Sequence, residues 1–118
     1  MLVQDYRTTK TWEDELRYSR PNMTIQNYMW ALQVFCDWSK TTPDELIIQR
    51  LGDISNKSDY IKTLAFKRIL DFQNSKRSRT KHTRDMIVKA LESFYHDNSA
   101  GIDNIDLDDT RLRLKTFL

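Results

Sequence analysis

The sequence predicts an all-α protein, a compact bundle of four to five short helices. Apolar residues recur mostly at spacings of three and four, which is the helical period. No alternation of apolar and polar residues is long enough to support a sheet. The 118 residues include only two glycines and two prolines, too few chain-reversing residues for a β-sandwich.

Length and composition indicate one folded domain. A chain of 118 residues can bury a core of its own, with little room for a second domain. Hydrophobic residues make up 39% and charged residues 31%, a balance typical of folded rather than disordered chains. One cysteine excludes an internal disulfide, and no apolar run reaches the roughly 18 residues of a membrane span. We therefore expect a cytoplasmic protein with no membrane association.

The first two helices are predicted over residues 11–18 and 24–39. Each range begins with a threonine that can cap a helix, and Pro21 separates them. Acidic residues fill the first turn of the first range, where the helix dipole favours negative charge. The second range carries a broad apolar stripe that we expect to be buried. Its members are Ile25, Tyr28, Met29, Leu32, Phe35 and Cys36, with Trp38 as a further candidate.

Three further helices complete the predicted bundle. The third begins at Thr42, because Thr42-Pro43-Asp44-Glu45 combines an N-cap, a proline at the first helical position and a capping-box glutamate. Gly52 is its predicted C-cap. The fourth and fifth helices are predicted over residues 58–73 and 80–96, each with an apolar stripe at helical spacing.

Charge is distributed unevenly along the chain, although the net charge is only +2. Residues 57–89 contain ten Lys or Arg against three Asp, and residues 75–84 contain five of these cations and no acid. This densest part spans a loop and a first helical turn, where hydroxyl and backbone N–H groups also face an anion. Unpaired cations at a helix N-terminus oppose the dipole, so a sequence that keeps them favours an anionic partner, nucleic acid first.

The polar side of the predicted helix 24–39 is a second candidate surface. Gln26, Asn27, Trp30 and Gln33 lie off the apolar stripe and can reach base edges or pack on sugars. The alternative is that these are ordinary surface residues and that Trp30 packs against Trp12 or the first helix.

Candidates for catalysis or metal binding are weak. His82 and His96 are fourteen residues apart, and a zinc site uses closer spacing. Cys36 lies on an apolar stripe and has no evident base beside it. The acidic residues at 103–109 lack the turn glycine and terminal glutamate of a calcium-binding loop. We therefore predict no catalytic residue, no metal site and no cofactor.

Three segments share a recognisable pattern. Residues 24–38 place Thr, Tyr, Leu, Phe and Trp at positions 24, 28, 32, 35 and 38; residues 42–47 read Thr-Pro-Asp-Glu-Leu-Ile; and residues 83–95 close with Ala-Leu-Glu-Ser-Phe-Tyr. In order and spacing they resemble the N-terminal core-binding (SAM-like) domain of tyrosine recombinases, the phage-integrase family, in its archaeal type. The resemblance covers about residues 12–98.

The resemblance implies a helical domain that forms half of a C-shaped clamp on duplex DNA. Residues 1–98 would be this DNA-binding domain, and residues 99–118 a linker toward a C-terminal catalytic domain. The family cuts and rejoins DNA in recombination and integration, but its catalytic Arg, His and Tyr have no counterparts here. Two helices would enter major grooves, those beginning at Thr24 and near Thr80. The DNA-contacting residues expected from the resemblance and the basic segment together are Gln26, Asn27, Trp30, Lys76, Arg77, Arg79, Lys81, His82, Thr83 and Arg84.

The expected function is therefore binding of duplex DNA without catalysis, in the cytoplasm on nucleoid or mobile-element DNA, with oligomerisation only on DNA. One alternative is a helical protein–protein interaction module with no affinity for nucleic acid. Another is an RNA-binding domain that uses the same basic loop, although no pair of exposed aromatics for base stacking is apparent. An enzymatic function is the least supported.

Overall fold

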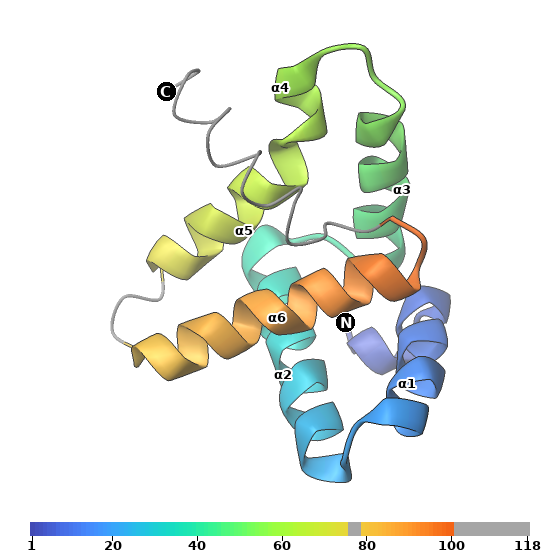
Figure 1. Cartoon of the computed structure of the whole chain (residues 1–118), viewed down its shortest axis with the longest axis vertical. Helices are drawn as coiled ribbons and strands as arrows, with labels where there is room; N and C mark the ends of the chain where they lie inside the picture. Colours follow the sequence, from blue (N-terminus) through green and yellow to red (C-terminus); the bar gives the residue numbers. More distant parts are fainter. Residues whose placement is uncertain (76–78, 101–118) are drawn as a thin grey trace.

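The computed structural model describes residues 1–75 and 79–100, and all regular structure in them is helical (Figure 1). The predicted all-α class is confirmed. There is one more α-helix than expected, because the fourth predicted helix is divided in two. The elements are a 3-10 helix η1 (Val3–Asp5) and the helices α1 (Arg7–Ser19), α2 (Asn22–Ser39), α3 (Pro43–Ile54), α4 (Asp59–Lys62), α5 (Leu64–Ser75) and α6 (Lys81–Asp97).

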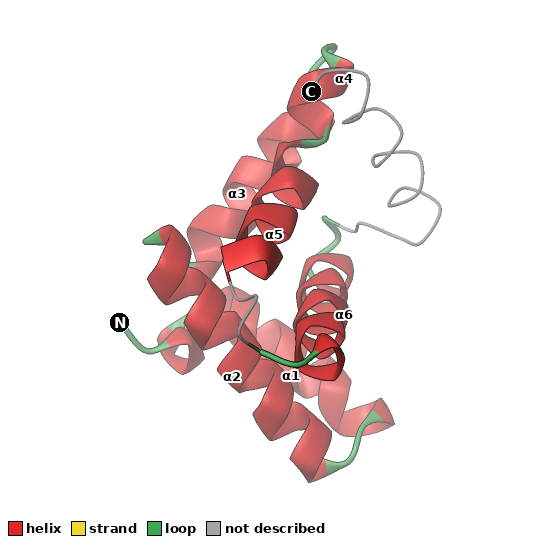
Figure 2. Ribbon diagram, turned by 90° about the vertical axis from the view of Figure 1, so that its left-hand side faces the viewer, coloured by secondary structure: helices red, strands yellow, loops and turns green. Residues whose placement is uncertain are grey.

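The core lies where α6 crosses α2, with α1 packed beside both (Figure 1). Trp12 of α1 is fully buried; its ring lies 6.0 Å from that of Tyr28 and 5.4 Å from that of Phe94. Together α2 and α6 supply eleven of the 21 buried hydrophobic side chains among the described residues. From this centre α3 and α5 run to α4, which lies at one end of the longest dimension (Figures 1 and 2).

Helix α1 begins at Arg7, four residues before the predicted start, and Thr11 is not its cap. The reason is a contact with α3. The Asp44 carboxylate accepts hydrogen bonds from the Thr8 backbone N–H (3.1 Å) and hydroxyl (2.7 Å). A residue distant in sequence thus supplies an acceptor that the first turn of a helix needs.

Helix α2 also begins earlier than predicted, at Asn22, with Pro21 in the N-cap position. Thr24 lies inside the helix and is not the cap. The helix ends at Ser39, and the φ of its C-cap Lys40, 54°, is in the left-handed region. This residue closes the helix in the role that glycine usually has.

Helix α3 begins as predicted, and the Thr42 hydroxyl accepts a hydrogen bond from the Glu45 N–H at 3.2 Å. Its predicted end is wrong. Gly52 is an interior residue, and the helix continues to Ile54 with Ser55 as its C-cap. A glycine inside a helix lowers helix stability by about 1 kcal/mol relative to alanine. The other contacts of α3 are sufficient to keep Gly52 helical.

The predicted helix 58–73 is interrupted at Thr63, between α4 and α5. Two side chains donate hydrogen bonds to backbone carbonyls that would accept backbone N–H groups in a continuous helix. The Thr63 hydroxyl donates to the Tyr60 carbonyl at 2.6 Å, and the buried Arg50 guanidinium donates to the Lys62 carbonyl at 2.6 Å. Ala100 is also fully buried, so packing extends two residues past the predicted boundary at residue 98.

Candidate nucleic-acid interface

Helix α2 presents a polar face opposite its buried stripe. Gln26 and Asn27 are exposed, and Trp30 keeps 37% of its surface exposed. Gln26 and Trp30 are four residues apart, so they are neighbours on one side of the helix. Trp12 is fully buried and stacks on Tyr28 within the core.

The start of α6 presents the second predicted group. Thr80 is the N-cap, and the helix begins at Lys81. Arg79, Lys81 and His82 are exposed, while Thr83 and Arg84 are half-buried. This end of α6 is therefore cationic on its outer side and apolar underneath.

One contact joins these two groups. The Arg79 guanidinium carbon lies 5.0 Å from the centroid of the Trp30 ring, a cation–π geometry. The residues are 49 positions apart in sequence. Arg79 therefore connects the polar face of α2 with the cationic start of α6, and we call the combined surface of Gln26, Asn27, Trp30, Arg79, Lys81, His82 and Arg84 the α2/α6 face.

Lys81 does not fit the expectation of unpaired cations. Its Nζ lies 2.8 Å from an Asp85 carboxylate oxygen one turn later, and 82% of the Lys81 side chain is exposed. The hydrogen bond from Lys81 lowers the pKa of Asp85, with the charges of Lys81, Lys89 and Arg84 acting in the same direction. Such an exposed pair is weak, so Lys81 can exchange Asp85 for another anion.

The hydroxyl groups of Thr80 and Thr83 also take part in capping this helix start. The Thr80 hydroxyl accepts the Thr83 N–H at 3.2 Å and lies 3.1 Å from the Thr83 hydroxyl. Thr83 therefore belongs to the cap. The assignment of Thr83 as a DNA contact stays a prediction. Lys76 and Arg77 of the predicted set lie outside the described residues.

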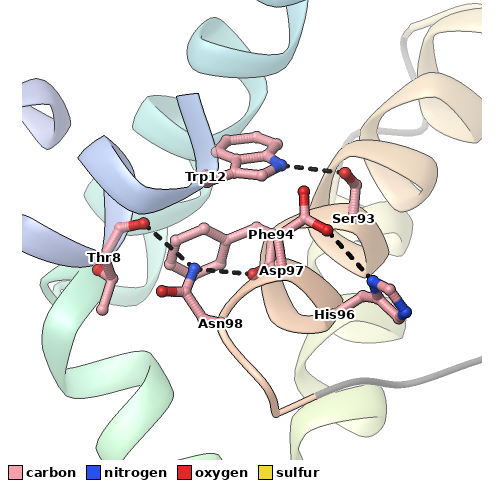
Figure 3. A network of polar contacts seen from close by, with 7 residues as sticks. All are labelled: Thr8, Trp12, Ser93, Phe94, His96, Asp97 and Asn98. Carbon is pink, nitrogen blue, oxygen red and sulfur yellow. Dashed lines mark hydrogen bonds and ion pairs between the residues drawn. The ribbon is translucent and has the colours of Figure 1, made fainter. Parts of the chain in front are cut away.

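A polar network fixes α6 against α1 (Figure 3). The Trp12 indole N–H donates to the Ser93 hydroxyl at 3.0 Å. The Asn98 amide donates to the carbonyls of Thr8 (3.1 Å) and Phe94 (2.9 Å). These bonds hold the C-terminal half of α6 against α1, and the helix also packs on α2.

A groove beside Trp30 was not foreseen from the sequence. It has a volume of about 400 Å³ and lies between η1 and α2. Gln33, one of the side chains expected to reach bases, is used to build it: its Oε1 accepts the Val3 N–H and its Nε2 donates to the Met1 carbonyl, both at 3.0 Å. Gln33 is therefore unsuited to base contact.

Other reactive residues have structural positions. Cys36 is fully buried in the core, as predicted, and burial raises the pKa of its thiol to about 12. His96 is exposed, with its Nδ1 3.2 Å from Asp97. In residues 1–75 and 79–100, no three His, Cys, Asp or Glu side chains form a group that could hold a metal ion. The acidic segment 103–109 lies outside the described residues.

Within the part of the chain that the structure describes, no helix has the length and apolar character needed to cross a bilayer. Comparison of the chain with protein-family models, with curated proteins and with solved structures found no match. A functional assignment therefore depends on the residues and geometry of the α2/α6 face.

Proposed function

We propose that this protein binds duplex DNA through the α2/α6 face, as the DNA-binding domain of a site-specific tyrosine recombinase or integrase, and that this chain has no catalytic activity. The observation that carries the proposal is the contact of Arg79 with Trp30 at 5.0 Å. The polar face of α2 and the cations at the start of α6 were indicated by separate features of the sequence. That contact joins them into one surface.

The proposed division of labour follows from the chemistry of the side chains. Arg79, Lys81 and Arg84 would bind phosphates and supply most of the affinity, with Lys76 and Arg77 of the same segment. Gln26 and Asn27 have both donors and acceptors, so they would read base edges in a groove. The protein would act in the cytoplasm, on nucleoid or mobile-element DNA. It would work with a C-terminal catalytic domain and oligomerise only on DNA.

The test is fluorescence anisotropy of a labelled duplex titrated with protein at several salt concentrations. Neutralisation of about five phosphates predicts that log K falls with log salt at a slope of about −4 to −5. Arg79→Ala should make that slope shallower by about 0.9. Lys57→Ala, in the loop between α3 and α4, is the matched control and should leave the slope unchanged. Absence of binding at low salt would end the proposal.

A second experiment tests the division of roles. Asn27→Ala should change the preference among duplexes of different sequence, whereas Arg79→Ala should weaken binding to all of them equally. Selection of preferred sites from a random duplex pool measures both effects. If both variants scale all affinities by one factor, Asn27 does not read bases.

One observation favours the alternative of a protein-interaction module. Ile48, Leu51 and Ile54 of α3 keep 69%, 45% and 40% of their surfaces exposed. Exposed apolar side chains that gather on one helix are typical of a partner surface. That function predicts protein binding insensitive to salt, with no affinity for duplex DNA.

A further inference from the structure

A second cleft lies between the C-terminal end of α2 and α5. Its volume is about 340 Å³. Neither the sequence pattern nor the α2/α6 face accounts for it. Its lining combines an indole ring, two cations, a hydroxyl, a carboxylate and one apolar side chain. These belong to Trp38, Lys67, Arg68, Ser39, Asp71 and Leu64.

Trp38 is held firmly while part of its ring stays accessible. Its ring centroid lies 6.0 Å from that of Phe35 and 5.3 Å from that of Phe72, and both phenylalanines are fully buried. Even so, 37% of Trp38 is exposed. Trp30 has the same exposed fraction, but its ring carries the Arg79 guanidinium. Trp38 therefore offers a fixed aromatic surface within a cleft, as a stacking site requires.

The same cleft carries an excess of positive charge. Lys67 and Arg68 come from consecutive positions of α5, and Asp71 supplies the one acidic group of the lining. One guanidinium nitrogen of Arg68 donates to the Gln49 Oε1 at 2.8 Å, which orients that side chain. A guanidinium has five N–H donors, so this bond leaves others for an oxyanion.

We propose that this cleft binds an unpaired nucleotide, with the base stacked on Trp38 and the phosphate held by Lys67 and Arg68. A paired base has both faces covered by its neighbours in the duplex, so a strand end, a gap or a single-stranded extension must supply the base. Trp30 and Trp38 are eight residues apart on α2, which corresponds to about 12 Å along the helix axis. One DNA molecule can therefore reach both. This inference rests on the proposed DNA binding and specifies its substrate class.

The test uses tryptophan fluorescence and three DNA ligands. The variant Trp30→Phe leaves buried Trp12 and the cleft residue Trp38 as the emitting tryptophans. We expect quenching by a short oligothymidylate and by a duplex with an oligothymidylate extension, but none by the same duplex with blunt ends. In the otherwise wild-type protein, Trp38→Leu should weaken binding of the extended duplex about 5- to 150-fold, the range of base–aromatic stacking, and leave blunt-duplex affinity unchanged. Trp38→Phe should retain most of the preference.

Two controls make each outcome decisive. Lys67→Gln with Arg68→Gln should reduce quenching by oligothymidylate, whereas Lys57→Gln should not. If thermal unfolding shows that Trp38→Leu is not folded, the Lys67 and Arg68 pair is tested in its place. Equal affinity for blunt and extended duplexes, with unchanged Trp38 emission, would overturn this inference and leave duplex binding standing. Failure to bind any of the three ligands would overturn both.

Discussion

The stacking of Arg79 on Trp30 has a measurable consequence for DNA binding. A planar guanidinium that lies on an aromatic ring uses its face for that contact and keeps its N–H edge free for a phosphate. The contact should therefore hold Arg79 in its binding geometry before DNA arrives. Replacing Trp30 by leucine removes this support without removing the charge, so it should weaken DNA binding through Arg79.

The size of the effect follows from the contact and its exposure. At exposed sites a cation–π contact contributes about 0.5–1 kcal/mol, which corresponds to about a 2- to 5-fold change in Kd. Both Arg79 and Trp30 are solvent-accessible, with the guanidinium carbon 5.0 Å from the ring centroid. We expect Trp30→Leu to raise Kd by that factor more when Arg79 is present than in an Arg79→Ala background.

A double-mutant cycle measured by anisotropy at one salt concentration gives the coupling directly. The wild type, both single variants and the double variant are titrated with the same duplex, and thermal unfolding verifies that each is folded. Tighter binding by Trp30→Leu would refute the reasoning, because Arg79 would then have to leave the ring to reach a phosphate. A coupling of zero would show that the two residues act independently.

Further predictions concern Asp85, Thr80 and Cys36. Asp85→Asn releases Lys81 from its 2.8 Å pair and should tighten DNA binding, whereas Lys81→Ala should make the log–log salt slope shallower by about 0.9; an unchanged slope for Lys81→Ala would show that Lys81 binds no phosphate. Since Lys81 lowers the pKa of Asp85, the stability from this pair is present above the ordinary carboxylate pKa and lost as pH falls through the lowered value; Asp85→Asn should flatten that part of an acid unfolding curve. Thr80→Ala removes the acceptor for the Thr83 N–H and should lower the free energy of unfolding by about 1 kcal/mol in urea, whereas Thr80→Ser should not. With the Cys36 thiol pKa raised to about 12, labelling by a thiol reagent at mildly alkaline pH should be about 1,000-fold slower than in urea-unfolded protein, and rapid native labelling would contradict the burial of this side chain.

The parts of the fold that follow from local chemistry were predictable. Thr42 and Thr80 cap their helices through residues three positions later, so the sequence alone located both starts. The start of α1 and the break at Thr63 depend on Asp44 and Arg50, which come from α3. Side chains distant in sequence contribute to these two helix boundaries, so a pattern of neighbouring residues does not predict them.

The candidate site shows the same limit. Periodicity predicted that Gln26, Asn27 and Trp30 lie off the buried stripe, and these residues are exposed. It could not indicate that Arg79 reaches Trp30, because that contact depends on how α6 crosses α2. Composition likewise identified Lys81 as a cation but did not indicate its ion pair with Asp85. The spacing of four residues between them was the feature that could have predicted this pair.

The Asp44 carboxylate bound to Thr8 also bears on how the molecule opens. The first turn of α1 takes this acceptor from the first turn of α3, so neither turn is an independent local structure. Native-state hydrogen exchange should therefore show the Thr8 amide opening together with α3 in one cooperative unit, although it lies near the chain terminus where fraying is usual. An excised peptide that ends before Asp44 should lose the turn from Arg7 to Lys10 and keep only the later part of α1 as nascent helix.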